Sequence, residues 1–187
     1  MMNADTRQSI LAVARGMVQA NGYAALSFRD IATAVGIKSA SVHYHFPTKG
    51  ALGAELARQY TAEMSAYLGS LIDEGVDPST FIQRYTGVFR GALANGNRMC
   101  MCGIMAAERD ELPPEVQEEV IRFSEVNVEW LTRALQVSDD PAVKDAGARA
   151  LAIYAAVEGA QLVSRGFNDI ALYDRTVEAY QTAGLIP

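Results

Sequence analysis

Hydrophobic residues along the chain recur with the spacing of an α-helix, and the alternating pattern of a β-strand is never sustained. Glycine, proline, asparagine and aspartate residues interrupt this pattern at intervals and mark the helix ends. The pattern predicts about nine helices, over residues 6–21, 28–35, 39–45, 49–72, 79–94, 99–110, 114–136, 141–166 and 170–184. The predicted fold class is therefore all-α.

The segment 27–49 contains the strongest local signals in the sequence. Ser27 is a typical N-cap, because its side-chain oxygen can accept from a backbone N–H two or three residues ahead. Gly36 supplies the left-handed backbone of a tight turn. Pro47 ends the next helix, and Thr48 can cap the long helix that follows. Two short helices joined by such a turn can place the second one in the major groove of DNA.

The second of these short helices has polar side chains at most of its positions. Val42 and Phe46 lie four residues apart and are predicted to face the core. The polar residues can donate hydrogen bonds to base edges near the start of the helix and to sugar–phosphate near its end. The candidate DNA-contacting residues are Ser27, Arg29, Lys38, Ser39, Ser41, His43, Tyr44, His45 and Lys49.

The distribution of charge agrees with this interpretation although the total does not. The 187 residues carry a net charge of −6, which argues against a nucleic-acid partner for the chain as a whole. Residues 1–52 carry a net charge of +3, however, and the remainder carries −9. A basic head on an acidic body can bind a polyanion at one end only.

The same segment resembles the N-terminal domain of the TetR family of bacterial one-component repressors. The resemblance covers about residues 6–55, and the spacing of the turn, the Tyr-His-Phe run and the lysine three residues later is specific to that family. The matching residues are Gly22, Tyr23, Ser27, Ile31, Ala32, Val35, Gly36, Ile37, Ser41, Val42, Tyr44, His45, Phe46, Lys49, Ala51 and Leu52.

The resemblance implies a fold and a mode of action. It implies a helix-turn-helix DNA-binding domain over residues 1–50 and a ligand-binding and dimerisation domain over residues 51–187, assembled as an Ω-shaped homodimer. The family's usual DNA-contacting positions fall on Ser41, His43, Tyr44, His45 and Lys49 of this chain. Most members have a tyrosine at the position of His43 and often a Lys-Gly pair at the position of Ser39-Ala40, so we expect this chain to read its own operator sequence.

The last two helices are the candidate dimer interface. Residues 150–163 are dense in small side chains, which allow helices to approach closely. Together with the last helix they can form a four-helix bundle across a two-fold axis. The alternative is that the helix is simply the buried centre of one protomer. The last helix would contribute Ile170, Leu172, Val177, Tyr180 and Leu185.

Aromatic and methionine residues of the body are candidates for a ligand pocket. Such pockets are mostly apolar and contain few polar groups, so we expect a small, fairly apolar inducer. Taken individually, each of these residues fits a place in the plain core better than a ligand contact. The candidates are Tyr67, Phe81, Tyr85, Phe89, Met101, Met105, Phe123, Trp130 and Tyr154, with Gln161 as a polar anchor.

Cys100 and Cys102 are the only cysteines of the chain. They are too few for a structural metal site, and their spacing makes a disulfide strained. Arg98 and a helix N-terminus can stabilise a thiolate, which leaves a thiol-based sensor as an alternative to two small buried residues. We expect no metal and no cofactor.

The predicted function is a ligand-responsive transcriptional repressor that binds double-stranded operator DNA. A small helical enzyme is the first alternative, but the sequence lacks a nucleophile triad, a phosphate loop and paired metal motifs. An interaction module that no longer binds DNA is the second. No apolar run reaches the roughly 20 residues of a membrane span, and the N-terminus lacks a signal-peptide core. We therefore expect a cytoplasmic protein.

Overall fold

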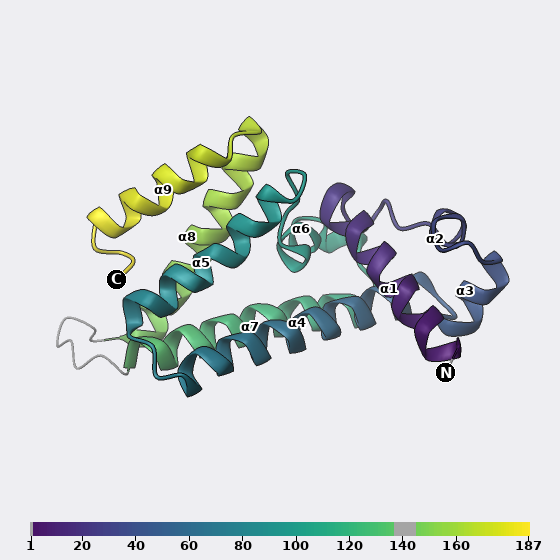
Figure 1. The fold of residues 1–187 in the computed structure, drawn as a ribbon, viewed down its shortest axis with the longest axis horizontal. Helices are drawn as coiled ribbons and strands as arrows, with labels where there is room; N and C mark the ends of the chain where they lie inside the picture. The colour runs from purple at the N-terminus through teal and green to yellow at the C-terminus, as the bar shows by residue number, and fades with distance from the viewer. Residues whose placement is uncertain (1, 137–144) are drawn as a thin grey trace. The chain divides into compact units, whose positions relative to one another are not determined.

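The computed structural model describes residues 2–136 and 145–187, and all regular elements in these ranges are helical (Figure 1). The prediction of an all-α fold is confirmed. The elements are α1 (Met2–Asn21), α2 (Phe28–Val35), α3 (Ser39–His45), α4 (Lys49–Asp73), α5 (Pro78–Ala94), α6 (Met101–Ala107), the 3₁₀ helix η1 (Arg109–Glu111), α7 (Pro114–Gln136), α8 (Ala146–Phe167) and α9 (Ile170–Thr182).

Helices α2, α3 and α7 begin and end at the predicted residues, whereas the other predicted helices differ at one end or both. Helix α1 begins at Met2 rather than at residue 6. The single helix expected over residues 99–110 is two elements, because the N–H of Glu108 donates to the carbonyl oxygen of Met105 and a 3₁₀ turn follows. Helix α8 begins at Ala146 with Asp145 as its N-cap. Residues 141–144 of that prediction lie outside the described residues.

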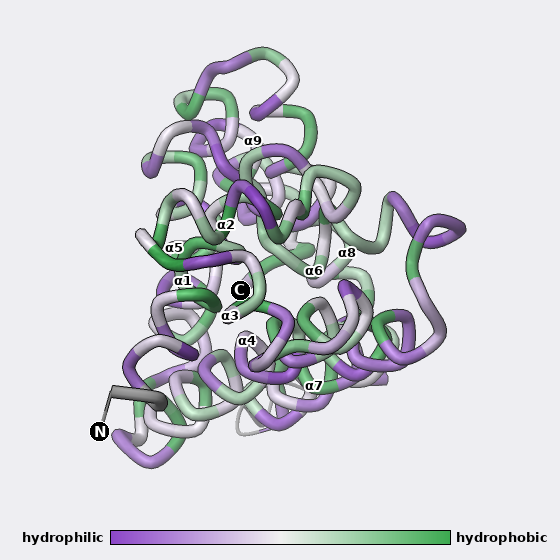
Figure 2. The backbone as a smooth tube through the Cα atoms, turned by 90° about the vertical axis from the view of Figure 1, so that its right-hand side faces the viewer, coloured by the Kyte–Doolittle hydropathy of each residue, from purple (hydrophilic) through white to green (hydrophobic). Residues whose placement is uncertain are grey.

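The described residues form two compact units. Unit 1 contains residues 2–60 and 101–123, and unit 2 contains residues 61–100, 124–136 and 145–187. Helices α4 and α7 each supply their first part to unit 1 and their second part to unit 2. Figure 2 shows hydrophobic and hydrophilic residues alternating along the helices, as expected where each helix buries one face.

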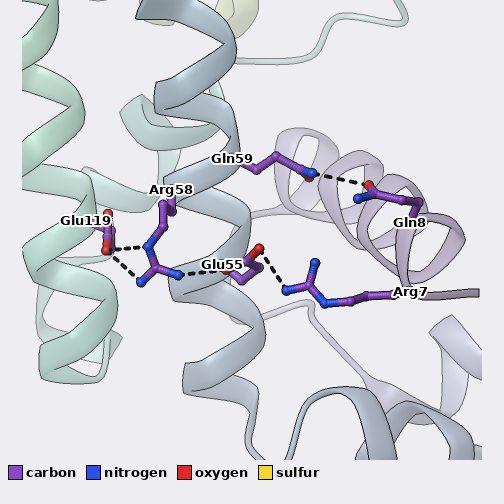
Figure 3. A network of polar contacts seen from close by, with 6 residues as sticks. All are labelled: Arg7, Gln8, Glu55, Arg58, Gln59 and Glu119. Atoms are coloured by element: carbon purple, nitrogen blue, oxygen red, sulfur yellow. Dashed lines mark hydrogen bonds and ion pairs between the residues drawn. The ribbon is translucent and has the colours of Figure 1, made fainter. Parts of the chain in front are cut away.

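Unit 1 is built around α1, which packs against both α2 and α6. Its core contains Ile10, Ile31, Val42, Leu52 and Phe123, all fully buried. A chain of polar contacts on its surface connects α1, α4 and α7 (Figure 3). Exposed ion pairs of this kind add little stability each, so the network mainly fixes orientation. It consists of Arg7, Glu55, Arg58 and Glu119, with N···O distances of 2.7–2.8 Å, and a Gln8–Gln59 hydrogen bond of 3.2 Å.

Unit 2 is built around α5, α8 and α9, which pack against one another. Phe81, Tyr85 and Phe89 of α5 face Ile153 and Val157 of α8 in its core, and all five are buried. Within the described ranges every helix is too short or too polar to serve as a membrane-spanning segment.

Candidate nucleic-acid interface

The turn between α2 and α3 forms as the sequence predicts. The Ser27 hydroxyl oxygen accepts a hydrogen bond of 3.3 Å from the backbone N–H of Asp30, which caps α2. Gly36 has φ +78°, a left-handed conformation that a side chain would strain. Its N–H donates to the carbonyl oxygen of Ala32 at 3.0 Å and closes the helix. The turn therefore orients α3 through local bonds alone.

Helix α3 buries one narrow stripe and exposes the rest. Val42 and Phe46 are 0% and 2% exposed, which confirms that they face the core. Tyr44 is 75% exposed, so packing within the protomer does not require its ring. Beside it lies an open surface depression, to which α1 contributes Thr6, a residue that the sequence did not single out. The depression is lined by Thr6, Ile37, Lys38, Ala40, Ser41, Tyr44 and His45.

The aromatic residues of α3 are held by ring contacts. The His43 ring meets the Phe28 ring edge-on, with the centroids 4.7 Å apart, so it packs against the start of α2. Tyr44 and His45 form a second edge contact at 5.3 Å. These contacts limit the number of side-chain conformations that would have to be frozen on binding.

Lys49, at the start of α4, is fixed within unit 1. Its ammonium donates to the carbonyl oxygen of Ala24 at 3.0 Å and lies 4.6 Å from the centre of the Tyr23 ring. The Thr48 hydroxyl oxygen accepts from the N–H of Ala51 at 2.9 Å, which confirms Thr48 as the cap of α4. An ammonium has three donors, so Lys49 can hold this loop and still offer an N–H to a phosphate.

A carboxylate from outside the helix-turn-helix holds the loop between α1 and α2 in place. Glu108, which follows α6, accepts a hydrogen bond from the backbone N–H of Tyr23. Gly22, the residue before Tyr23, has φ +85°, and a Cβ on it would lie 2.2 Å from a Glu108 oxygen. Burial and the nearby charge of Glu115 raise the pKa of Tyr23 to about 12. The sequence analysis did not identify this contact, because a partner 85 residues away leaves no local signal.

Comparison with known proteins decides the family. A regulator from Legionella pneumophila, described as a TetR transcriptional regulator, is 32% identical over 96% of both chains, with a TM-score of 0.85. The chain belongs to the TetR family. The sequence profile of the bacterial regulatory proteins of the tetR family matches residues 10–56, which contain α2 and α3. The chain is thus a DNA-binding transcriptional regulator.

Other solved structures agree with this assignment. A TetR-family transcriptional regulator from Agrobacterium tumefaciens is 31% identical over 95% of this chain and 96% of its own, with a TM-score of 0.88. The regulatory protein TetR from Rhodobacter sphaeroides has the same fold at 19% identity, with a TM-score of 0.83 over 92% of this chain and 95% of its own. Among curated proteins, none matches this chain.

The residues predicted to line a ligand pocket fall into both units of this TetR-family fold. Met101, Met105 and Phe123 are buried in unit 1, where the Phe123 ring stacks on Tyr60 with the centroids 5.2 Å apart. Tyr67 is 39% exposed on α4. The remaining candidates, all in unit 2, are Phe81, Tyr85, Phe89, Trp130, Tyr154 and Gln161. Among these, Tyr85 and Phe89 contact each other at 5.2 Å between ring centroids.

Gln161 and Trp130, two of the polar candidates in unit 2, both make internal hydrogen bonds. The Gln161 amide donates to the carbonyl oxygen of Phe89 at 2.7 Å and accepts from the N–H of Cys100 at 2.8 Å. It therefore joins α8 to α5 and to the segment before α6. The Trp130 indole N–H donates to the Ser65 hydroxyl at 3.0 Å. Their binding of a ligand stays a prediction.

Glu158 is the polar residue of unit 2 that the sequence prediction missed. Burial raises the pKa of its carboxyl group from 4.5 to about 7, and the neighbouring Cys100 and Tyr154 only moderate this rise. A signal existed in the sequence, because Glu158 is the one charged residue in the apolar stretch 150–163. An acidic residue in such an apolar stretch lowers the stability of the fold, so its presence suggests a functional role.

Cys100 and Cys102 are both buried as thiols, each 1% exposed. A redox-sensing cysteine needs access to oxidant and thiolate character, and burial in apolar surroundings opposes both. Among the described residues, no cluster of potential ligands suited to a metal ion occurs.

Proposed function

We propose that this TetR-family regulator is a homodimeric repressor that leaves its operator when a small ligand binds in unit 2. The carrying observation is Tyr44, whose ring lies 75% exposed in a surface of hydroxyl, imidazole and ammonium donors. Such a set serves phosphate and base-edge contacts, whereas it adds little to the folding of unit 1. The proposed DNA contacts are Ser27, Arg29, Lys38, Ser39, Ser41, His43, Tyr44, His45 and Lys49.

Selection of duplexes from a random library tests the operator-binding part. Two heads related by a two-fold axis should enrich an inverted repeat, with half-site centres about 10 base pairs or a multiple of that apart. The enriched duplex, placed in a promoter upstream of a reporter gene, should lower expression when the protein is present. Enrichment of no sequence would contradict operator recognition, and raised expression would contradict repression.

The proposed dimer interface is the exposed apolar face of α8 with α9. Leu151 and Leu162 are each 57% exposed and lie three helical turns apart, hence on one face. Val163 and Phe167, which lie four residues apart, form a second exposed apolar patch towards the end of α8. A Cβ at Gly159 or Gly166 would meet no atom within 4 Å, so the fold of one protomer does not require these glycines. A second helix packed closely against α8 would require these glycines, because small residues let helix backbones approach each other.

The predicted residues of α9 agree with this arrangement. Ile170, Leu172, Val177, Tyr180 and Leu185 are each only half-buried within the protomer. A contiguous apolar surface of this kind is typical of a permanent subunit interface. Light scattering at micromolar concentration should give twice the mass of one 20.2 kDa chain. A monomer would contradict the proposed dimer.

Release by a ligand requires a difference in ligand affinity between two states of the protein. A ligand that weakens DNA binding must itself bind more weakly to the DNA-bound form, by the same factor. Titration of ligand in the presence and absence of the selected duplex measures that factor. Equal ligand affinity in the two titrations would contradict release by ligand.

A further inference from the structure

The interior of unit 2 contains a carboxyl group that its neighbours satisfy incompletely. Both carboxylate oxygens of Glu158 are inaccessible to water, and neither makes a hydrogen bond of standard geometry among the described residues. The same holds for the hydroxyl of Tyr85, whose side chain is fully buried. Interactions with Cys100 and Tyr154 lower the pKa of Glu158 by less than burial raises it. Glu158 lies on α8 and Tyr85 on α5, and these helices pack against each other.

The two groups are electrostatically close. Burial raises the pKa of Tyr85 well above its usual value, and the negative charge of Glu158 is the next largest cause. The same charge raises the pKa of Tyr173 after the effect of burial. Glu158 therefore imposes a negative potential on the tyrosines around it.

Loose packing does not explain the unsatisfied pair, because neighbouring polar groups are well bonded. The Tyr173 hydroxyl donates to the carbonyl oxygen of Thr86 at 2.9 Å. The Thr86 hydroxyl donates in turn to the carbonyl oxygen of Ile82 at 3.0 Å. Both polar ends of Gln161 are also engaged. Buried polar groups in proteins are nearly always satisfied, so each exception calls for an explanation such as a bound water, an ion or a ligand.

Within the described part of the chain, Glu158 forms no ion pair with a lysine or arginine. Arg90, whose charge acts on the neighbouring Tyr173, is paired with Asp174 at the surface by two hydrogen bonds of 2.7 and 2.9 Å. The groups around Glu158 are instead aromatic, and ring faces attract cations.

We infer that Glu158 and Tyr85 form the recognition point for an organic cation, a ligand that carries a protonated amino or amidino group on an apolar or aromatic body. This inference rests on the proposed function, in which unit 2 takes a regulatory ligand. A primary ammonium has three N–H donors. Two can serve the oxygens of Glu158 and the third the hydroxyl oxygen of Tyr85. The cation would hold Glu158 in its charged form, and a charge-assisted bond in a dry interior is strong.

This chemistry discriminates between ligand classes. A carboxylate or phosphate ligand would meet the negative charge of Glu158 without a compensating cation. A neutral alcohol has a single donor and leaves one carboxylate oxygen unsatisfied. The inference therefore adds a positive charge to the small, fairly apolar inducer expected from the sequence.

Calorimetric titration of the full chain with matched pairs of probes tests the inference. The cations are benzylammonium, 2-phenylethylammonium, n-hexylammonium and benzamidinium. Their neutral partners are benzyl alcohol, 2-phenylethanol, n-hexanol and benzamide. We expect at least one cation to bind ten-fold or more tightly than its neutral partner. Tenfold preference for none of the four cations would overturn the inference.

Three variants assign the preference to the site. Glu158→Gln keeps the size of the side chain but removes its charge, and should remove the cation preference. Tyr85→Phe should weaken cation binding about threefold and serves as the second variant if Glu158→Gln fails to fold. Glu125→Gln, at an exposed position of α7, is the matched control and should bind cations like the unmodified protein. An unchanged preference in both site variants would overturn the inference.

Duplex binding separates this inference from the proposed function. If the protein binds its selected duplex but shows no Glu158-dependent cation preference, the inference fails and the repressor proposal stands. If no duplex is bound while the cation preference is present, the DNA part of the proposed function fails instead.

Discussion

Helices α3 and α8 each leave a large aromatic residue in solvent, but the surroundings of the two rings differ. Tyr44 on α3 is 75% exposed and Phe167 on α8 is 74% exposed. The neighbours of Tyr44 include Lys38, Ser41 and His45, whereas Phe167 lies one helical turn from the exposed Val163. The neighbours of an exposed ring thus indicate its partner, a polyanion for α3 and a second apolar helix for α8.

Disruption of the apolar face should have the largest effect. Phe167→Asp buries a charge in the proposed interface of both protomers, so we expect the dimer to weaken by about 4 kcal/mol, roughly 1,000-fold. Light scattering over a dilution series measures this change. Ile121→Asp on α7, at a residue 49% exposed in unit 1, is the matched control and should leave the dimer intact. Equal weakening of the dimer by the two substitutions would contradict a specific role of α8 in the interface.

The second prediction extends the comparison to the interior, where Glu108 of unit 1 accepts a hydrogen bond and Glu158 of unit 2 accepts none of standard geometry among the described residues. The pKa of Glu158 is about 7 in the folded protein and 4.5 in the reference state. Between these values the unfolded chain has lost a proton that the folded chain retains. The contribution of Glu158 to the free energy of unfolding therefore falls as pH rises from about 4.5 to about 7, and is constant above that range.

Glu158→Gln should abolish this loss of stability with rising pH. Relative to the unmodified protein, the variant should gain up to about 3 kcal/mol of stability at pH 8 compared with pH 4.5. Urea unfolding at the two pH values and one fixed protein concentration gives the difference, with Glu125→Gln as control. An equal stability difference between Glu158→Gln and the unmodified protein at both pH values would show that the pKa of Glu158 is not raised in the folded protein.

The third prediction removes the exposed ring of α3. Tyr44→Ala should weaken binding of the selected duplex by about 2 kcal/mol, roughly 30-fold, because a sugar–phosphate contact of a pre-oriented side chain is lost. Stability and dimerisation should not change, since the ring is exposed. Fluorescence anisotropy of a labelled duplex measures the affinity. Tyr67→Ala, at an exposed tyrosine of unit 2, provides the control, and an equal loss there would argue against a specific role of α3.

The smallest expected effect concerns a single phosphate contact. Arg29→Ala at the start of α2 should weaken binding three- to fivefold, about 1 kcal/mol, and lower the slope of log affinity against log salt by about one per protomer. Arg122→Ala removes an equally exposed cation from α7 and should change neither quantity. An unchanged slope for Arg29→Ala would exclude Arg29 as a phosphate contact.

Local features of the sequence were sufficient to predict the helix-turn-helix. The cap at Ser27, the left-handed Gly36 and the cap at Thr48 act within four residues, so α2 and α3 were bounded correctly. The features that were missed depend on distant partners. Glu108 is bound to Tyr23, and Glu158 is identified only by what surrounds it in the fold.

The candidate sites divide in the same way. The polar face of α3 could be predicted because helical periodicity separates Val42 and Phe46 from the residues that remain exposed. The composition of the pocket stays a prediction, because periodicity identifies an apolar face but not which residues share a space. Met101 and Tyr85, both pocket candidates, belong to different compact units.

The central claim is that α3 presents a surface for DNA although the chain is acidic, with a net charge of −6. The salt dependence of binding to the selected duplex tests this most directly. Two heads that together neutralise six or more phosphates should lose about 1,000-fold in affinity between roughly 50 and 200 mM salt. A change of less than about threefold over that range would contradict the claim.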